Sequence, residues 1–348
     1  MISKIIKEDL IQQAKADIES VDDIVIVTHT RPDGDAVGSS LAFSLFLKGL
    51  GKNVTVIVPT AMPEFFLWMP TADEVLTYTE QKSLADVRIK SAELIFALDF
   101  NDLNRIGDMA ISVANAQAKK ILVDHHLNPE GFASLIISYP DMSSTSEMIF
   151  RLICRMGYYA EMTKECAECI YTGMMTDTGS FTFNSSKAEI YTIISKLIEK
   201  GIDKDEIHRR VYDNYSENRF RMLGHLLSER MKIYPEYGAA VLYLNKEDLA
   251  MYHNQAGDTE GFVNIPLSIK GVVMSAFFKE DMDKIRVSFR SQGDVAVNEF
   301  ASQYFNGGGH KNAAGGTMML SLEETIKLFE EKLPTLKEQL DKQSQKDA

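Results

Sequence analysis

Short apolar runs alternate with helical segments between residues 1 and 185, and this alternation constrains the fold more than any other feature. The runs are continuous in valine, isoleucine and leucine, as expected of strands buried on both faces of a sheet. The expected strands are Ile24–Thr28, Val54–Val58, Leu94–Leu98, Ile121–Val123 and Leu135–Ile137. Strands that alternate with helices predict a mainly parallel sheet flanked by helices, an α/β fold.

Two local patterns mark helices within this first part. Residues Ala36–Leu50 have the clearest helical pattern, and the N-terminus of that helix is a candidate to favour a nearby phosphate through its dipole. The segment Ser144-Thr145-Ser146-Glu147 reads as a capping box that starts a helix ending near Gly157. Residues 1–186 are therefore expected to form one domain.

The pattern changes twice after this domain. Residues 187–230 are helical and charged, which predicts a connector, and residues 231–340 predict a second, smaller α/β domain. The expected strands of the second domain are Ala239–Leu244, Val272–Phe278 and Ile285–Arg290, and a glycine-rich loop follows at 307–310. The sequence therefore predicts two domains joined by helices.

Composition narrows the function classes. A chain of 348 residues with a net charge of -13 lacks the basic surface that a protein tracking long duplex nucleic acid needs. A small phosphorylated substrate remains compatible with that charge. We expect no membrane span, no signal segment and a cytoplasmic location, and the three cysteines suit a reducing compartment.

Histidine and aspartate side chains gather where the predicted strands end. The candidates come from sequence-distant segments and are His29, Asp33, Asp35, Asp99, Asp124, His125, His126 and Asp177. Because the carboxyl ends of parallel strands line one crevice, we expect these side chains to meet there. Taken alone, each of these residues could instead be an ordinary helix cap or turn residue. Asp124 could orient a histidine instead of binding metal.

Several aspartates in one crevice need cations or protons. Two carboxylates 4 Å apart repel by about 4 kcal/mol at an effective dielectric constant of 20. Divalent ions remove this repulsion without large pKa shifts, and the candidates are numerous enough for two ions. Carboxylate and imidazole donors without thiolate favour manganese over structural zinc, with Mg²⁺ or Co²⁺ as alternatives. The sequence therefore predicts a site for two divalent ions, suited to attack on phosphorus.

The same segments, together with later ones, resemble the motifs of the DHH phosphoesterase family with its DHH-associated C-terminal domain. The matching motifs are His29-x-x-x-Asp33-x-Asp35, Leu98-Asp99, Val123-Asp124-His125-His126, Ser143 to Glu147, Thr176-Asp177-Thr178-Gly179 and Gly307-Gly308-Gly309-His310. They follow the family's order over nearly the whole chain. Within the family, the resemblance is greatest to bacterial enzymes that degrade nanoRNA and phosphoadenosine phosphate.

The resemblance implies roles for the metal-binding segments. One ion would be held by His29 and Asp33. The other would be held by Asp35, His125 and Asp177, with Asp99 bridging the two ions. Asp99, His125 and His126 would be catalytic, with His126 facing the scissile phosphate. Asp124 would not bind an ion itself and would instead contact the residues that do.

The resemblance also implies substrate-binding residues. They are Arg105, His126, Arg290, Ser291, Gly308, Gly309 and His310. An arginine can grip a phosphate in a bidentate manner, and glycines let backbone N–H groups approach phosphate oxygens. For Arg105 a solvated surface position is the alternative.

The implied activity is hydrolysis of short single-stranded oligonucleotides (nanoRNA), of 3'-phosphoadenosine 5'-phosphate (pAp), or of both, by a metal-activated hydroxide. Cyclic or linear dinucleotide phosphodiesterase activity is one alternative. A catalytically silent nucleotide-binding regulator is another, and formation of a homodimer is left open.

Overall fold

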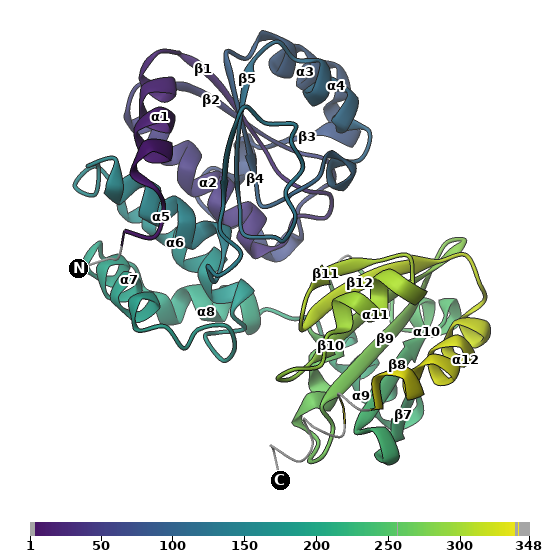
Figure 1. Cartoon of the computed structure of the whole chain (residues 1–348). Helices are drawn as coiled ribbons and strands as arrows, with labels where there is room; N and C mark the ends of the chain where they lie inside the picture. The colour runs from purple at the N-terminus through teal and green to yellow at the C-terminus, as the bar shows by residue number, and fades with distance from the viewer. Residues whose placement is uncertain (1–3, 256, 338–339, 341–348) are drawn as a thin grey trace. The chain divides into compact units, whose positions relative to one another are not determined.

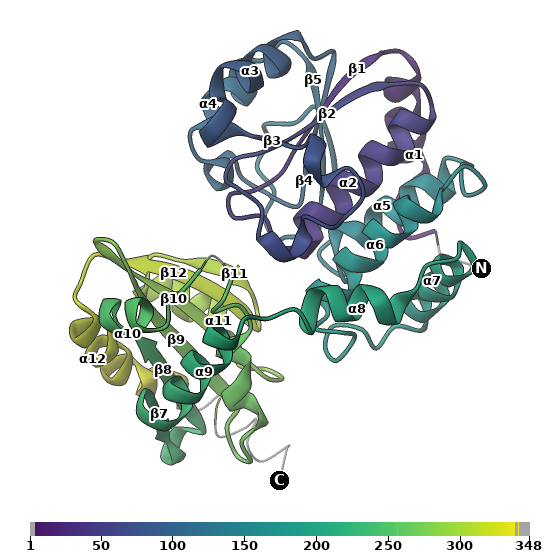
Figure 2. The same cartoon turned by 180° about the vertical axis from the view of Figure 1, so that it is seen from behind.

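The chain folds into two compact units in the computed structural model (Figures 1 and 2), which describes residues 4–255, 257–337 and 340. The units are Met1–Asn214 and Tyr215–Ala348. The segment 187–230, expected to be a separate connector, is divided between them. Helices α7 (Ala188–Glu199) and α8 (Lys204–Tyr212) belong to the first unit, and α9 (Glu217–Glu229) belongs to the second.

A six-stranded sheet forms the centre of the first unit. Its strands are β1 (Asp23–Val27), β2 (Asn53–Val58), β3 (Leu76–Thr77), β4 (Leu94–Leu98), β5 (Lys119–Asp124) and β6 (Leu135–Ser138). They lie in the order β3-β2-β1-β4-β5-β6, and every neighbouring pair is parallel. The predicted α/β class and the predicted parallel sheet are confirmed. The two-residue strand β3 is too short to give a sequence pattern, and it was not predicted.

Helices cover both faces of this sheet (Figure 1). One face carries α1 (Glu8–Glu19), α2 (Gly34–Gly49), α5 (Thr145–Arg155), α6 (Lys164–Asp177), α7 and α8, and the other carries α3 (Tyr78–Ser91) and α4 (Met109–Asn115). Side chains of β1 alternate between the two apolar layers, with Ile24 and Ile26 in one and Val25 and Val27 in the other. Burial on both faces explains why the strands read as continuous apolar runs.

The strand order places a topological switch point between β1 and β4. The chain leaves β1 through α2 on one face and leaves β4 through α4 on the other. The two connections diverge, and in sheets of this topology ligands bind beyond the carboxyl ends of these strands, a region called the crevice below.

Helices α2 and α6 approach at backbone distance through glycines. A Cβ atom added to Gly38 would lie 2.6 Å from the carbonyl oxygen of Cys169, and one added to Gly34 would lie 2.2 Å from Thr176 Oγ1. On α6, a Cβ at Gly173 would lie 1.9 Å from Ser146 Oγ. This contact brings the N-terminal end of α2 beside the C-terminal end of α6.

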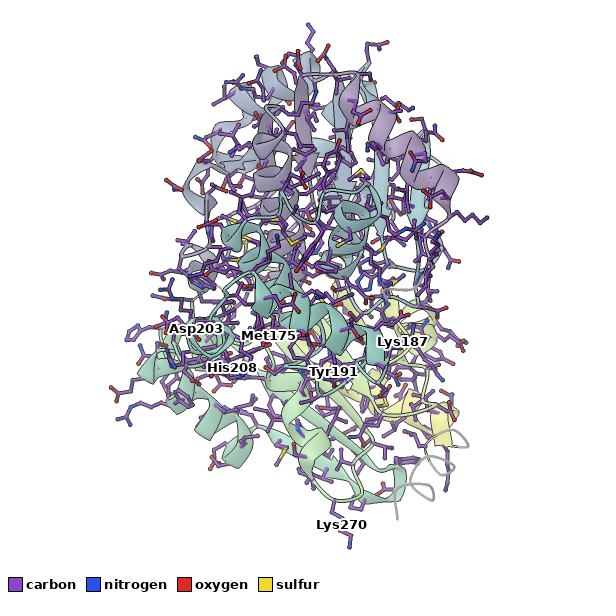
Figure 3. The ribbon with its side chains drawn as sticks, turned by 90° about the vertical axis from the view of Figure 1, so that its left-hand side faces the viewer. Met175, Lys187, Tyr191, Asp203, His208 and Lys270 are labelled. Carbon is purple, nitrogen blue, oxygen red and sulfur yellow. The ribbon has the colours of Figure 1, made fainter. Side chains whose placement is uncertain are left out.

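The helical layer continues from α6 into α7 and α8. Met175 lies on α6, Tyr191 on α7 and His208 on α8, and Figure 3 shows the three side chains in neighbouring helices of the first unit. Tyr191 is an exposed side chain, whereas Met175 is fully buried. Within the part of the chain that the structure describes, none of the helices is both long enough and apolar enough to cross a membrane.

The second unit contains a mixed sheet in the order β11-β12-β10-β9-β8-β7. Its elements are β7 (Met231–Tyr234), β8 (Ala239–Leu244), α10 (Lys246–Met251), β9 (Met274–Asp281), β10 (Lys284–Ser291), α11 (Val297–Tyr304), β11 (Gly308–His310), β12 (Ala313–Met318) and α12 (Leu322–Lys332). Strands β8 and β9 are parallel, and the other pairs are antiparallel. Phe278, Phe289 and Phe329 form the centre of its apolar core.

The glycine-rich segment is not the loop that the sequence predicted. Gly308–His310 forms the edge strand β11, which pairs with β12. A Cβ at Gly307 would lie 1.9 Å from the carbonyl oxygen of Gly315, and one at Gly309 would lie 2.5 Å from that of Ala313. These two glycines are required by the close approach of neighbouring backbone, whereas a Cβ at Gly308 would meet open space.

The α2–α6 contact predicts opposite effects of alanine at two glycines of the same helix. Gly38→Ala should destabilise the protein by about 1 to 3 kcal/mol, because its methyl group would overlap the α6 backbone. Gly49→Ala adds a methyl group in open space, and it should be neutral or stabilising by up to about 1 kcal/mol. Urea unfolding measures both effects; equal stabilities of the two variants would contradict the contact.

Candidate metal centre

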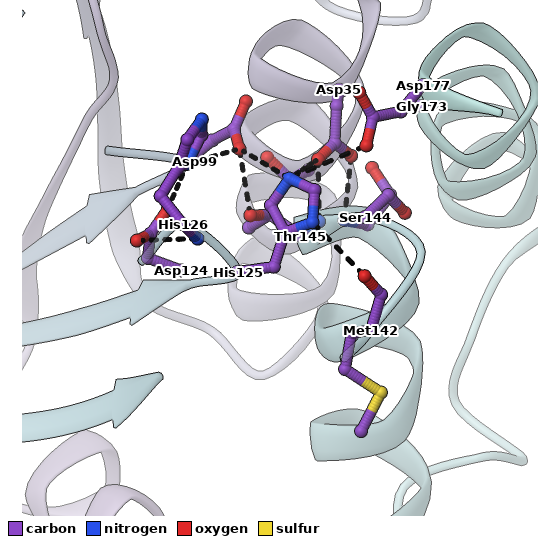
Figure 4. Close-up of polar contacts among 12 residues, drawn as sticks. Asp35, Asp99, Asp124, His125, His126, Met142, Ser144, Thr145, Gly173 and Asp177 are labelled. Atoms are coloured by element: carbon purple, nitrogen blue, oxygen red, sulfur yellow. Dashed lines mark hydrogen bonds and ion pairs between the residues drawn. The ribbon is translucent and has the colours of Figure 1, made fainter. Parts of the chain in front are cut away.

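The predicted ligands converge beyond the carboxyl ends of β1, β4 and β5, and Figure 4 shows Asp35, Asp99, His125 and Asp177 among them. His29 follows β1, Asp99 follows β4 directly, and Asp124 is the last residue of β5. His125 comes next in the chain and points into the same crevice. Asp177 comes from a different kind of element, because it is the last residue of helix α6.

His29 presents one ring nitrogen to two carboxylates. Its Nδ1 lies 2.9 Å from the carbonyl oxygen of Thr30, so Nδ1 carries the proton that it donates there. Its Nε2 lies 3.5 Å from Asp99 Oδ2 and 3.8 Å from Asp33 Oδ2. This buried nitrogen has no hydrogen-bond partner. A buried nitrogen without a partner, facing two carboxylates, fits a metal ligand.

His125 repeats this arrangement on the other side of Asp99. Its Nδ1 lies 3.2 Å from the carbonyl oxygen of Met142, to which it donates. Its Nε2 lies 3.5 Å from Asp177 Oδ2, 3.6 Å from Asp99 Oδ1 and 3.9 Å from Asp35 Oδ2. A histidine fixed through one nitrogen presents the other to a metal.

Asp99 lies between the two histidines, with a different oxygen toward each. Oδ2 faces His29, and Oδ1 faces His125 and accepts a hydrogen bond of 3.0 Å from Thr145 Oγ1. Its backbone has φ of 64°, in the left-handed region that aspartate and asparagine tolerate better than most residues. The backbone turn directly after β4 therefore aims this carboxylate into the crevice.

Asp35 is held by the N-terminus of helix α5. Its Oδ2 accepts a hydrogen bond of 2.6 Å from the Thr145 N–H, and its Oδ1 accepts one of 2.8 Å from the Ser146 N–H. The positive end of the helix dipole favours the carboxylate here. Burial, followed by the charges of Asp99 and Asp177, nevertheless raises the pKa of Asp35 well above its usual value.

Thr145 and Ser146 hydrogen-bond to carboxylates of the candidate site, although the sequence reasoning gave neither residue a role there. The signal was present as an unusual run of polar residues, Ser143 to Ser146, all of which are buried. The predicted capping box is only half formed. Ser144 Oγ accepts from the Glu147 N–H, but the Glu147 carboxylate instead accepts from Ser143 and pairs with Arg151.

Asp33 and Asp124 each accept hydrogen bonds from residues that lie two or three positions away in the chain. Asp33 Oδ1 accepts from the N–H groups of Asp35 and Ala36, so it occupies the donors at the start of α2 that the sequence suggested for phosphate. Asp124 accepts hydrogen bonds from the His126 ring at 2.7 Å and from the His126 N–H at 3.0 Å. Asp124 thereby fixes the orientation of the His126 ring.

The histidines partly neutralise the carboxylates. Burial would lower the pKa of His125, but the charges of Asp177, Asp99 and Asp35 outweigh it and raise that pKa to about 9. Burial would raise the pKa of Asp99, but the adjacent His29 ring and the charges of His126 and His125 hold it below its usual value. The crevice therefore attracts positive charge.

Within the first unit, three sets of side chains bring their ligand atoms within 4.8 Å of one another, and two of the sets share Asp99. The sets are His29, Asp33 and Asp99; Asp35, His125 and Asp177; and Asp99, Asp124 and His126. Each of the first two could hold a divalent cation. In the third set, Asp124 and His126 already bond to each other.

The predicted substrate residues lie in two places. Arg105 lies in a 3₁₀ turn, Leu103–Ile106, whose Arg105 carbonyl accepts from the Thr30 N–H at 2.8 Å, next to His29. In the second unit, Arg290 at the end of β10 lies opposite Ala313 of β12, which lies opposite His310 of β11. Ser291 Oγ donates to the Val295 carbonyl, so this hydroxyl has a structural partner.

The three cysteines lie outside the site. Cys166 and Cys169 are buried in α6, and Cys154 is half-buried in α5. Burial raises the pKa of the Cys166 thiol to about 12, so it is protonated at neutral pH and is a poor metal ligand.

Comparison with known proteins agrees with this architecture. The DHH family, N-terminal domain, matches residues 23–174, and the DHHA1 domain matches residues 239–345. An uncharacterised protein of Mycoplasma pneumoniae is 30% identical over 85% of this chain and 86% of its own length. The chain belongs to the DHH family of phosphoesterases.

Characterised relatives lie within the same family. The bifunctional oligoribonuclease and PAP phosphatase NrnA of Thermus thermophilus is 29% identical, with 91% of this chain and 90% of the relative covered. NrnA of Bacillus subtilis is 28% identical, with 86% and 91% covered.

Solved structures extend the comparison. The protein in the crystal structure of an exopolyphosphatase-related protein from Bacteroides fragilis is 50% identical to this chain, with a TM-score of 0.94. The match covers 98% of this chain and 100% of the chain in that structure. RecJ from Thermus thermophilus, solved with Mn²⁺, is 14% identical with a TM-score of 0.53, and it covers 98% of this chain and 55% of its own. The RecJ likeness shows the fold alone.

The Thr145 hydroxyl offers a test of how Asp99 is oriented. Thr145→Val removes the hydrogen bond to Asp99 but keeps the backbone N–H that Asp35 accepts. We expect Mn²⁺ affinity to fall by roughly tenfold, because partners that orient metal ligands typically contribute 10- to 100-fold. Isothermal titration calorimetry measures the affinity.

The matched control is Thr192→Val on the exposed surface of α7, where the hydroxyl bonds only its own helix. This variant should bind Mn²⁺ as the unchanged protein does. Equal affinities of the two variants would show that Asp99 does not depend on the hydroxyl.

Proposed function

We propose that the chain is a two-metal phosphoesterase that hydrolyses short oligoribonucleotides and 3'-phosphoadenosine 5'-phosphate. The observation that carries this proposal is Asp99, whose two oxygens face two separate histidine-carboxylate sets. A carboxylate in that position can bridge two cations about 3.5 to 4 Å apart, the spacing used for in-line attack on phosphorus. The names of the NrnA relatives support the substrate class.

In this proposal each ion has its own histidine. His29 and Asp33 hold one ion, whereas Asp35, His125 and Asp177 hold the other. The unpartnered Nε2 of His29 supports the first assignment. The crowding of Asp35, Asp99 and Asp177 around His125 supports the second, because cations would remove their mutual repulsion.

Manganese suits this donor set best. The ligands are carboxylates and imidazoles, which fit borderline-hard ions, and the cysteines lie outside the site. Mg²⁺ and Co²⁺ are the alternatives. When bound, two such ions would supply charge neutralisation for the phosphoryl group and lower the pKa of a water.

Side chains of the protein are proposed to stabilise the reacting phosphate, to orient the metal ligands and to bind the substrate. The His126 ring, whose Nδ1 donates to Asp124, is proposed to donate a hydrogen bond from Nε2–H of its imidazolium form to a phosphate oxygen as negative charge develops there. Thr145 keeps Asp99 oriented, and the α5 N-terminus keeps Asp35 in place. Arg105 is proposed to bind the substrate phosphate beside His29.

The second unit is proposed to recognise the far end of the substrate through Arg290, Ser291, Gly308, Gly309 and His310. Arg290 and His310 belong to strands that flank β12, so both extend from one end of the same sheet. Gly308 is exposed and has open space at its Cα, which leaves room for a phosphate. Gly309 is proposed to contribute to substrate binding indirectly, because it allows β11 to approach β12 closely.

A substrate panel tests the proposal directly. It contains pAp, di- to pentaribonucleotides, cyclic dinucleotides, pyrophosphate and polyphosphate, each with Mn²⁺, Mg²⁺ or chelator. We expect phosphate or mononucleotide release from pAp and short RNA, dependent on the ion. Hydrolysis of pyrophosphate or polyphosphate alone would contradict the substrate class, and preference for cyclic dinucleotides would favour the phosphodiesterase alternative. No hydrolysis at all would favour a silent regulator.

Asp99→Asn is the appropriate variant for the bridging role. Asparagine has the same shape and tolerates the left-handed backbone at this position, whereas alanine would add backbone strain. We expect activity to fall by more than roughly 100-fold, since loss of a shared ligand should exceed the loss of an orienting partner. Activity near that of the unchanged enzyme would overturn the bridging assignment.

Gly308→Val tests the substrate surface of the second unit. The added side chain enters open space, so the fold should persist, but the KM for pAp should rise by about tenfold if a phosphate binds there. Gly224→Val on helix α9 also enters open space and is the control. An unchanged KM for the Gly308 variant would remove this glycine from the proposed surface.

A further inference from the structure

The loop that follows Asp177 has an unusual backbone. Gly179, Ser180 and Phe181 have φ of 53°, 57° and 63° in succession, and Asn184 has φ of 48°. Three consecutive residues in the left-handed region are costly for ordinary side chains, and such strain gathers at functional sites. The loop after Asp177 is therefore a candidate functional segment.

Backbone hydrogen bonds fold the loop onto the end of α6. The Ser180 N–H donates to the carbonyl of Met175 at 2.8 Å, and the Phe183 N–H donates to that of Thr178 at 3.2 Å. The hydroxyl of Thr178, fully buried, accepts from the Phe181 N–H at 3.1 Å. These bonds fix the backbone of Phe183 to the residue next to Asp177.

The two phenylalanines of the loop have different surroundings. Phe181 packs against the apolar core, with its ring centroid 5.7 Å from that of Tyr171. The side chain of Phe183 is 50% exposed and belongs to none of the apolar clusters among the described residues. Phe183 therefore contributes little to the core.

Phe183 is nevertheless held in one place. A Cβ on Gly179 would lie 2.2 Å from Cε1 and 2.7 Å from Cζ of the Phe183 ring, so the edge of the ring covers the Gly179 Cα. The positive φ favours glycine at residue 179, and its missing side chain leaves room for the ring. The loop thus holds an exposed aromatic ring against the backbone two residues after Asp177.

We propose that the Phe183 ring is a stacking platform for a base of the nucleotide whose phosphate binds at the metal centre. The inference rests on the proposed function and adds a residue that determines specificity. A base is one ribose away from its phosphate, and an aromatic ring held near a ligand of the phosphate site can meet its face. Stacking on an aromatic side chain accepts every base, so this contact recognises a nucleotide without selecting its sequence.

Paired substrates separate the contribution of the base from that of the phosphates. KM and kcat are measured for pAp and for ribose 3,5-bisphosphate, which has the same phosphates but no base. Phe183→Ala should raise the KM for pAp roughly tenfold while leaving kcat and the KM for the baseless ester unchanged. Phe183→Tyr should retain the low KM, and Phe183→Leu, apolar but not aromatic, should behave as the alanine variant does.

Ile111→Ala is the control, because Ile111 is 70% exposed on α4, on the opposite face of the sheet. Its kinetics should match those of the unchanged enzyme. If Phe183→Ala affects both substrates equally, or neither, the stacking proposal is wrong although the proposed function stands. If the unchanged enzyme hydrolyses neither substrate nor short RNA, the proposed function itself fails.

A measurement without turnover adds an independent readout. In Phe183→Trp, adenosine monophosphate should quench the indole fluorescence when Mn²⁺ is present, beyond any change from Trp68, the one native tryptophan. The unchanged protein titrated in the same way gives the contribution of Trp68. Equal fluorescence changes in the two proteins would overturn the stacking platform.

Discussion

The Asp35 carboxylate bound to the N-terminus of α5 is the interaction on which the rest of the centre depends. It joins the start of α2 to the start of α5 through two backbone N–H groups. The same helix start supplies the Thr145 hydroxyl to Asp99. One helix start thus holds both carboxylates, Asp35 through backbone N–H groups and the helix dipole, and Asp99 through a side-chain hydroxyl.

The glycines between α2 and α6 complete what this helix terminus begins. Asp177 comes from the last turn of α6, which lies close to the start of α2 and to Asp35. The centre therefore combines side chains from the carboxyl edge of a sheet with one from a helix end. Its family membership agrees with that construction, since the N-terminal family domain covers the sheet and most of α6.

Strand geometry made part of the centre predictable from the sequence. His29, Asp99 and His125 could be placed together because each comes after a strand whose carboxyl end must lie at one edge of a parallel sheet. The sequence reasoning grouped Asp177 with these strand-end residues, and the family motif assigned it to one ion, but Asp177 comes from the end of helix α6 and not from a strand. The contributions of Thr145 and Ser146 could not be predicted, because they depend on which backbone donors a distant carboxylate reaches.

Two local patterns led to wrong predictions for a common physical reason. Gly307 and Gly309 indicated a loop, yet they are glycines because β11 and β12 approach too closely for a Cβ. Glu147 indicated a capping box, yet its carboxylate pairs with the buried Arg151. In both cases the local pattern was correct for an isolated segment, and a contact with another segment decided the outcome.

The backbone contact of α2 with α6 has a consequence for which ions the centre can accept. At Gly38 helix α2 meets the backbone of α6 directly, so at that point a change of side-chain rotamer cannot alter the spacing of the two helices that carry Asp35 and Asp177. The other side is freer, because the Asp33 side chain is 59% exposed whereas that of Asp35 is 1% exposed. In the proposed two-ion arrangement, Asp33 is the carboxylate with the most room to adjust to an ion of different radius, followed by Asp177, whose side chain is 28% exposed.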